Sequence, residues 1–399
     1  AAVPAAKNSV LPLLAAALLC RGTVRLRAVP ALSDVECCLA LLRGAGCDAR
    51  RQGADVVVSG TPVCSTLPGD AAARMRASIL FCAPLLARLG RAETSLPGGC
   101  PIGQRPIDQH LKGMSALGAK VKFDHGGVTL SGRLRGAVIY LDMPSVGATE
   151  NLLMAATLAS GTTRIENAAK EPEIVDLAAF LNAMGARVSG AGTSTIVIEG
   201  VRALHGVSWQ PIADRIEAGT MACACAITGG ELLLSGARAE HLRSLLFKLS
   251  EAGIHIKDTP GGLMVFGRAK QPFEIRTMVY PGFPTDLQQP MSALLCTATG
   301  TSTVVENIFE SRFRHLSEME RMGARVRIYE QTAVIEGVPQ LHGAAVEATD
   351  LRAGAALVIA GLMAQGTTEI YNTHFIDRGY EHLEEKLNSL GAKISRTTD

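Results

Sequence analysis

Residues 151–161 read N-L-L-M-A-A-T-L-A-S-G, and residues 162–167 continue as T-T-R-I-E-N. The first run is apolar on nearly every side of a helix, which predicts a helix buried inside the protein. Gly161 suits its end because glycine readily adopts the left-handed conformation that closes helices. The second run is rich in residues that favour strands. The stretch therefore predicts a buried helix followed by a strand.

This pattern recurs six times along the chain. The glycines that end an apolar run are Gly22, Gly90, Gly161, Gly229, Gly300 and Gly366. A second series, in which each glycine ends a helix and precedes a strand, consists of Gly46, Gly118, Gly185, Gly253, Gly323 and Gly391. Neighbours in the second series are 67 to 72 residues apart. One repeat therefore reads as buried helix, strand, amphipathic helix, glycine, strand, turn and strand.

Six repeats of this length favour two globular α/β domains over a solenoid, whose repeats are usually shorter. We expect residues 7–213 to form one domain from repeats one to three. Residues 214–399, together with residues 1–6, are expected to form the other. Only six residues precede Lys7, so we expect the strand before the first buried helix to be lost or shortened. Residues 9–20 resemble a signal peptide, but the repeat identifies them as that first buried helix.

Composition excludes several classes of function. The chain has 399 residues, is 47% apolar and 4% aromatic, and carries a net charge of +2 with no long basic run, so a nucleic-acid partner is not expected. Its ten cysteines form no C-x-x-C pair and have no clustered histidines beside them. Neither a metal site nor a disulfide framework is therefore predicted. Scattered thiols favour a reducing, cytoplasmic location.

The residue fourteen positions before each glycine of the first series lies at the predicted start of a buried helix. These residues are Asn8, Arg76, Gly147, Arg215, Asp286 and Arg352. Helix capping would explain the Asn and the Asp. It does not explain three arginines, because a cation is unfavourable at the positive end of a helix unless an anion lies nearby. The pattern therefore predicts that several helix starts face a shared anionic ligand.

Gly147 lies within S-V-G-A-T (145–149), and its bare backbone could closely approach a diphosphate group. A second candidate segment is S-L-P-G-G-C-P-I-G-Q-R-P (95–106), whose three glycines and three prolines predict an ordered loop and a candidate lid. Cys100 lies in this polar loop, while most other cysteines lie in apolar runs. Arg105 could favour its thiolate. A reactive thiol and an incidental surface thiol both remain open from these residues alone.

Several further segments extend these motifs along the chain. They are A-A-K-N (5–8), R-M-R-A-S (74–78), L-P-G-G-C-P-I-G-Q-R-P-I-D (96–108), S-V-G-A-T (145–149), N-A-A-K-E-P-E-I-V-D (167–176), A-D-R-I-E-A-G (213–219), F-P-T-D-L-Q (283–288), T-D-L-R-A (349–353) and I-D-R-G-Y-E (376–381). In this order they resemble the UDP-N-acetylglucosamine enolpyruvyl transferases of the enolpyruvyl transferase superfamily, and the resemblance covers nearly the whole chain.

The resemblance implies two similar domains, each of three βαβαββ units around buried helices. This arrangement is an inside-out α/β barrel with the active site in the cleft between the domains. It also implies transfer of the enolpyruvyl group of phosphoenolpyruvate to the 3-hydroxyl of UDP-N-acetylglucosamine, with no cofactor and no membrane insertion. Two alternatives stay open: a catalytically silent UDP-sugar-binding regulator, and transfer to shikimate 3-phosphate, whose family lacks the cysteine loop.

The resemblance also implies roles for individual residues. The expected catalytic residues are Cys100, Asp286, Lys7 and Arg378. Phosphoenolpyruvate is expected to be bound by Lys7, Asn8, Arg76, Cys100, Arg105, Arg352 and Arg378. The UDP-sugar is expected to be bound by Asn8, Arg76, Arg105, Pro106, Ile107, Asp108, Ser145, Val146, Gly147, Asp286 and Ile308. In this family the loop cysteine helps to protonate the enol carbon and is alkylated by fosfomycin, and the carboxylate at Asp286 takes the proton from the sugar hydroxyl.

The chain departs from the family pattern at three positions, Ser33, Met143 and Phe375. Other members often carry a basic residue at the first two positions and a histidine at the third. These departures imply differences in how the sugar nucleotide is bound, and none of them affects the reacting groups.

Overall fold

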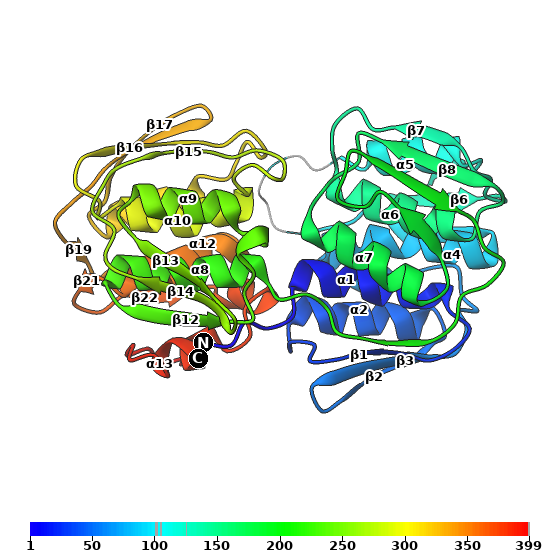
Figure 1. Ribbon diagram of the computed structural model, residues 1–399, viewed down its shortest axis with the longest axis horizontal. Coiled ribbons are helices and arrows are strands. Elements are labelled where there is room, and N and C mark those ends of the chain that lie inside the picture. Colours follow the sequence, from blue (N-terminus) through cyan, green and yellow to red (C-terminus); the bar gives the residue numbers. More distant parts are fainter. Residues whose placement is uncertain (100–102, 104–105, 125, 398–399) are drawn as a thin grey trace. The chain divides into compact units, whose positions relative to one another are not determined.

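The computed structural model describes residues 1–99, 103, 106–124 and 126–397. The chain forms two compact units, shown in Figure 1. The N-terminal unit consists of the described residues within Ala5–Gly99 and Arg105–Ile212. The C-terminal unit consists of those within Ala1–Pro4, Cys100–Gln104 and Ala213–Asp399. None of the described helices has the length and apolar composition that crossing a membrane requires.

The N-terminal unit contains, in chain order, α1 (Lys7–Ala16), η1 (Ala17–Leu19), β1 (Val24–Leu26), α2 (Ser33–Gly44), β2 (Asp48–Gln52), β3 (Asp55–Ser59), α3 (Gly69–Arg74), η2 (Arg76–Phe81), α4 (Cys82–Leu89), β4 (Arg91–Ser95), α5 (Asp108–Ala116), β5 (Lys120–Asp124), β6 (Gly127–Ser131), β7 (Val138–Tyr140), α6 (Val146–Thr157), β8 (Thr162–Glu166), α7 (Pro172–Ala183), β9 (Arg187–Ser189), β10 (Thr195–Glu199) and β11 (Val207–Trp209).

The C-terminal unit contains α8 (Arg215–Thr228), β12 (Glu231–Ser235), η3 (Ala239–His241), α9 (Arg243–Glu251), β13 (His255–Thr259), β14 (Gly262–Phe266), β15 (Glu274–Arg276), η4 (Thr285–Leu287), α10 (Gln288–Leu295), β16 (Thr301–Val305), α11 (Arg314–Arg321), β17 (Arg325–Tyr329), β18 (Thr332–Glu336), β19 (Leu341–His342), β20 (Ala345–Glu347), α12 (Leu351–Gly361), β21 (Ala364–Gln365), β22 (Glu369–Tyr371), η5 (Thr373–Arg378) and α13 (Leu383–Asn388).

The repeat predicted from the glycines is confirmed by the order of strands in the sheets. Three four-stranded sheets have the orders β11-β1-β3-β2, β7-β8-β10-β9 and β15-β16-β18-β17. In each of them the first two strands run parallel, and the remaining pairs run antiparallel. The sheets β4-β6-β5 and β12-β14-β13 repeat the same antiparallel core. The chain therefore has the predicted α/β fold of repeated units, built from separate small sheets.

The ends of the repeats share strands. Within the described residues no strand precedes α1 in repeat one, as expected, and β11 instead pairs with β1 in parallel, with Val24 opposite Val207. The end of repeat three thus supplies the first strand of repeat one. In repeat six the expectation is wrong: the strand predicted after Gly391 is absent from the described residues 392–397.

The residues before α1 complete a sheet of the C-terminal unit. Ala2 bridges Ser235 in parallel beside β12, and the Val3 N–H donates to the Ser235 carbonyl over 3.0 Å. Pro4 accepts a hydrogen bond of 2.8 Å from the Asp214 N–H. Repeat four therefore takes its first strand from a segment more than two hundred residues away in sequence.

The buried helices form the interior of each unit, as their apolar sequences predicted. In the C-terminal unit α8, α10 and α12 pack on one another, and Figure 1 shows them side by side within the surrounding strands. In the N-terminal unit α1 packs on α2 and α7, and α6 packs on α4, α5 and α7. In repeat two the predicted helix is divided into η2 and α4, and α3 lies before its predicted start at Arg76. Pro84 lies at the third position of α4, where its ring disfavours a continuous α-helix through residue 80.

The glycines that precede the strands adopt the left-handed backbone that the sequence predicted. All six residues of that series have φ between 89° and 103°. In the other series Gly22 is the exception, because its φ is not positive. A Cβ atom at Gly22 would lie 2.9 Å from the Gly206 nitrogen, so close packing and not backbone conformation calls for glycine there.

One buried carboxylate joins three segments of the N-terminal unit. Asp176, in α7, is 4% exposed and accepts hydrogen bonds from the Ser9 hydroxyl, from the Trp209 indole N–H at 3.0 Å and from the Ile212 N–H at 3.3 Å. These donors come from the first turn of α1, from β11 and from the segment that leaves the unit. Asp176 therefore holds together the two chain segments through which the N-terminal unit begins and ends.

Asp176→Ala is expected to lower the free energy of unfolding of the N-terminal unit by about 3 kcal/mol, because three buried donors lose their acceptor. Trp209 is the only tryptophan, so urea unfolding followed by its fluorescence reports on this unit alone. Asp48→Ala, which removes an exposed carboxylate of β2, is the control and should change stability by less than about 0.5 kcal/mol. Equal stability of the two variants would contradict this role of Asp176.

Candidate functional site

The first turn of α1 carries two of the predicted site residues. Lys7 is its first residue and is 7% exposed, and Asn8 is the second and half-buried. The Lys7 Nζ lies 2.7 Å from Asp34 Oδ2, in the first turn of α2. A lysine at a helix start is unfavourable by itself, and the neighbouring carboxylate compensates for it. Lys7, which is predicted to bind the phosphate group of the substrate, is thus held in place by the buried carboxylate of Asp34.

Three helix starts come together elsewhere in the N-terminal unit. Arg76 begins η2, and its Nη2 donates to the Pro106 carbonyl over 2.9 Å, just before α5. The α5 residue His110 lies against Gly147, because a Cβ at Gly147 would be 3.1 Å from His110 Cε1. Ser145 caps α6 by accepting from the Ala148 N–H. The structure therefore brings predicted residues of three motifs into one neighbourhood, with Ile107 and Asp108 at the start of α5.

Packing gives a further reason for a glycine at position 147. A Cβ atom there would meet the His110 ring, 3.1 Å from Cε1 and 3.3 Å from Nε2. His110 also bonds to Asn151 through Nδ1 at 3.0 Å. Burial, and then the charge of Arg76, lowers the pKa of His110 to about 4, so the ring is neutral at pH 7.

The C-terminal unit holds a buried ionic cluster around Asp286, in η4. Its Oδ1 accepts from Arg312 Nη2 at 2.7 Å, and its Oδ2 accepts from Arg352 Nη2 at 3.2 Å. The side chains of Arg312, Arg352 and Asp286 are 4%, 2% and 27% exposed. The Arg352 guanidinium also lies over the Tyr380 ring, 5.2 Å from its centroid. Two guanidinium groups therefore share one carboxylate in this cluster.

The charges in this cluster determine how Asp286 titrates. Burial by itself would raise its pKa, but the charges of Arg312 and Arg352 and the hydrogen bonds they donate outweigh burial and hold the pKa of Asp286 well below its usual range. Within the described residues, Arg352 Nε and Nη1 and Arg312 Nε make no hydrogen bond. Buried donors without acceptors are rare in proteins. The cluster thus contains buried N–H donors that no described acceptor satisfies.

The other expected site residues of the C-terminal unit lie close in sequence to this cluster. Ile308 follows β16, and its N–H donates to Glu306 Oε1 at 2.9 Å. Arg378 ends η5 and is half-buried.

The six positions found by counting back from the glycines are confirmed as helix starts, since each is the first or second residue of a helical segment. The chain itself supplies part of the negative charge that arginines there require. Asp214 caps α8 beside Arg215, and Asp350 caps α12 beside Arg352, each accepting from two backbone N–H groups. The Arg215 guanidinium also lies over the Tyr280 ring, 5.5 Å from the ring centroid. An external anion is therefore only part of the reason why arginines stand at these helix starts.

Cys100 and Arg105 lie outside the described residues, so the structure gives no geometry for them. The nine described cysteines are free thiols, and most are buried. Cys64 is exposed, which the sequence analysis did not predict.

Two residues of these neighbourhoods were missed by the sequence analysis. Arg312 lies in the connection between β16 and α11 and His110 lies inside α5, so neither occupies a helix start that the repeat would identify. The signal for Arg312 is weak, since S-R-F-R is one of many basic segments. Among the described residues, the group with metal-binding spacing is His382, Glu384 and Glu385 near α13. It includes none of the predicted site residues.

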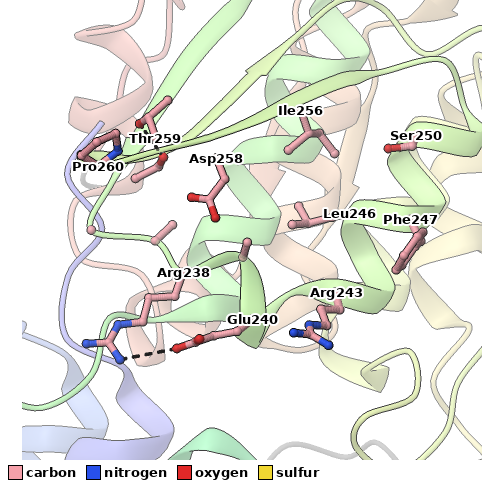
Figure 2. Close-up of a pocket in the computed structure, with 15 residues that line it drawn as sticks. Arg238, Glu240, Arg243, Leu246, Phe247, Ser250, Ile256, Asp258, Thr259 and Pro260 are labelled. Atoms are coloured by element: carbon pink, nitrogen blue, oxygen red, sulfur yellow. Dashed lines mark hydrogen bonds and ion pairs between the residues drawn. The ribbon is translucent and has the colours of Figure 1, made fainter.

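A cavity of about 850 Å³ opens on the C-terminal unit between α9 and the β13–β14 hairpin. Figure 2 shows Arg238 paired with Glu240 at its edge, with Leu246, Phe247 and Ile256 on another side. None of the predicted site residues that the structure describes lines it. Its charged groups are exposed, whereas those around Asp286 are buried, so we place the candidate site at the Asp286 cluster and not in this cavity.

His110→Gln is expected to reduce the acid sensitivity of the N-terminal unit. In the unfolded wild type His110 takes up a proton at about pH 6.5, but in the folded protein only at about pH 4. The free energy of unfolding therefore falls by about 2 kcal/mol as the pH drops between these values. Trp209 fluorescence during urea unfolding at pH 7 and pH 4.5 measures the difference. His205→Gln, at an exposed histidine, should retain the wild-type pH dependence.

Asp286→Asn is expected to destabilise the C-terminal unit by about 3 kcal/mol, because two buried guanidinium groups lose their counter-charge. Inorganic phosphate should restore part of this loss by pairing with the same groups. Circular dichroism is the suitable probe, since the only tryptophan lies in the N-terminal unit. Asp258→Asn, at an exposed carboxylate, is the control, and an equal response to phosphate in both variants would contradict an anion site at Asp286.

Comparison with known proteins assigns the family. The model of the family described as EPSP synthase (3-phosphoshikimate 1-carboxyvinyltransferase) matches residues 1–387. The chain is 53% identical to UDP-N-acetylglucosamine 1-carboxyvinyltransferase 2 of Carboxydothermus hydrogenoformans, over 100% of this chain and 96% of that protein. It is 51% identical to UDP-N-acetylglucosamine 1-carboxyvinyltransferase 1 of Caldanaerobacter subterraneus subsp. tengcongensis, over 99% and 95%.

Solved structures agree with this family. The enolpyruvyl transferase NikO of Streptomyces tendae matches with a TM-score of 0.90 and 27% identity, over 100% of this chain and 96% of that one. An EPSP synthase of Acinetobacter baumannii matches with a TM-score of 0.76 and 19% identity, over 98% and 95%, which supports the fold alone. The chain belongs to the enolpyruvyl transferase family of EPSP synthase and, within it, to the UDP-N-acetylglucosamine 1-carboxyvinyltransferases.

Proposed function

We propose that this transferase moves the enolpyruvyl group of phosphoenolpyruvate to the 3-hydroxyl of UDP-N-acetylglucosamine and releases phosphate, the first committed step of peptidoglycan synthesis. The observation that carries the proposal is the Asp286 carboxylate held ionised between two buried arginines. The carboxylate can accept a proton, and the free guanidinium N–H groups can bind an anion. Relatives that match 99–100% of the chain bear the name of this activity.

The proposal divides the substrates among the predicted residues. Phosphoenolpyruvate is bound by Lys7, Asn8, Arg76, Cys100, Arg105, Arg352 and Arg378. The UDP-sugar is bound by Asn8, Arg76, Arg105, Pro106, Ile107, Asp108, Ser145, Val146, Gly147, Asp286 and Ile308. We add Arg312 to the residues around the UDP-sugar because it contacts Asp286 directly.

The reaction is an addition followed by an elimination. The sugar 3-oxygen bonds to the central carbon of phosphoenolpyruvate while its proton passes to Asp286, and the methylene carbon receives a proton with help from Cys100. The resulting ketal keeps both anionic groups, so fixed cations stabilise it throughout. The carbon–oxygen bond to phosphate then breaks, the methyl carbon loses a proton, and the enol ether and inorganic phosphate are released.

The low pKa of Asp286 bears on its role as a base. While both arginines pair with it, the carboxylate is ionised but holds a proton weakly. An anionic substrate that binds Arg352 competes for the same guanidinium and weakens its pairing with Asp286. The pKa of Asp286 then rises, and the carboxylate becomes a stronger base when the substrate is present.

The remaining parts of the proposal concern partners and location. The substrates are two small molecules, with no nucleic acid and no membrane insertion, and fosfomycin is expected to alkylate Cys100. The nine described cysteines are free thiols, which suits a reducing cytoplasm.

The test is phosphate release with phosphoenolpyruvate and each candidate acceptor. Release is expected with UDP-N-acetylglucosamine and not with shikimate 3-phosphate or without an acceptor. Cys100→Ala should reduce turnover by at least about 100-fold, the range of general acid–base effects, and should abolish labelling by fosfomycin. Cys64→Ser, which removes the exposed described thiol, should leave both unchanged. A folded wild-type protein that binds UDP-N-acetylglucosamine but releases no phosphate would instead support the silent regulator.

A further inference from the structure

A buried carboxylate, that of Glu306, lies next to the Asp286 cluster in the C-terminal unit. Glu306 directly follows β16 and is 1% exposed. Its Oε1 accepts from Thr277 Oγ1 at 2.8 Å, from the Ile308 N–H at 2.9 Å and from the Phe309 N–H at 3.2 Å. Its Oε2 accepts from Thr285 Oγ1 at 2.9 Å. Within the described residues Glu306 forms no ion pair, so hydroxyl and backbone donors alone satisfy its oxygens.

The Thr285 hydroxyl connects this carboxylate to Arg312. Arg312 Nη1 lies 2.7 Å from Thr285 Oγ1, and Arg312 Nη2 lies 2.7 Å from Asp286 Oδ1. A guanidinium can only donate hydrogen bonds, and a hydroxyl has one proton to give. The hydroxyl therefore accepts from Arg312 and gives its proton to Glu306. This arrangement fixes the direction of every hydrogen bond from Glu306 to Asp286.

The arrangement also explains how Arg312 is kept in one orientation. Two of its N–H groups are directed at two acceptors on adjacent residues, Thr285 and Asp286, and its guanidinium lies 5.3 Å from the Phe309 ring centroid. Without an acceptor for its own proton, the Thr285 hydroxyl could rotate that proton toward Arg312 and no longer accept from it. Glu306 removes this freedom.

We propose that Glu306 and Thr285 are positioning residues of the transferase: Glu306 orients the Thr285 hydroxyl, Thr285 orients Arg312, and Arg312 holds Asp286 at the sugar 3-hydroxyl. This inference rests on the proposed function. Through Oε1 the same carboxylate fixes the Ile308 N–H, so one side chain sets both the base and a residue of the predicted sugar site.

A purely structural role for Glu306 is the rival explanation, since its Oε1 also caps residues 308 and 309. The two threonines separate the explanations. Thr277 and Thr285 each donate one hydroxyl hydrogen bond to Glu306, but within the described contacts only Thr285 touches Arg312. Thr277→Val is therefore a matched control. It removes the hydrogen bond to Oε1 of the same carboxylate, and the Thr277 hydroxyl, like that of Thr285, also accepts one hydrogen bond, from the Asn307 N–H at 2.8 Å.

The kinetic experiment compares Thr285→Val, Thr285→Ser and Thr277→Val by phosphate release. Thr285→Val is expected to lower kcat at least about 10-fold, because misplacing a reacting group has effects of this size, while the KM for UDP-N-acetylglucosamine changes less than about 3-fold. Thr285→Ser retains the hydroxyl and should stay within about 2-fold of wild-type kcat. Thr277→Val should stay within about 3-fold. Equal losses in Thr285→Val and Thr277→Val would overturn the proposal.

Glu306→Gln tests the first link of the chain. A glutamine amide has only one acceptor oxygen, and we expect that oxygen to face the three donors now at Oε1. The amide nitrogen then faces Thr285, so kcat should fall as in Thr285→Val. Because both changes break one chain, the double variant should be no slower than the slower single variant. Losses that multiply would show independent effects and would contradict the relay.

Crystal structures of Thr285→Val and Thr277→Val separate this inference from the proposed function. The Arg312–Asp286 contact should be lost or lengthened in the first and retained in the second, whatever the enzymatic activity. If the wild type releases no phosphate, the proposed function fails, and these structures still decide the inference. An Arg312–Asp286 contact unchanged in Thr285→Val would overturn it.

Discussion

The pairing of Asp286 with Arg312 and Arg352 is the interaction on which the candidate site of the C-terminal unit depends. Removing an arginine and a carboxylate from water is costly, and a buried ion pair is kept only where geometry and further hydrogen bonds offset that cost. Here the offset is incomplete, since several guanidinium N–H groups have no acceptor among the described residues. This incompleteness is typical of a binding site, because the missing acceptor is what a ligand supplies.

The repeated unit explains why charged groups can gather at such a position. Each buried helix begins at the same place in its repeat, so the helix starts present backbone N–H groups and polar side chains at equivalent positions. The apolar remainder of each helix packs in the interior, which is why the sites concentrate at the ends. A mainly aliphatic and alanine-rich core permits this close packing of helices in both units.

The sequence predicted those features that recur. The helix starts at Arg76, Arg215 and Arg352 followed from a fixed count, and the left-handed glycines followed from their spacing. Features that occur once were not predictable in this way. Arg312 lies between β16 and α11, at a position that the count from the glycines does not reach, and the pairing of Lys7 with Asp34 depends on how α1 packs on α2. The place of β11 beside β1 was missed because strand pairing between distant segments leaves no local pattern.

The pairing of residues 1–3 with β12 has a consequence for how the chain folds. Ala1 donates from its amino group to the Leu233 carbonyl, across a separation of 232 residues, and Val3 pairs with Ser235 nearby. During translation the segment around Ala2 and Val3 emerges long before its partner strand exists. Repeat four can therefore close its sheet only late, after the ribosome has made β12. Contacts of such long range slow folding, and until then an unpaired strand edge is open to wrong partners.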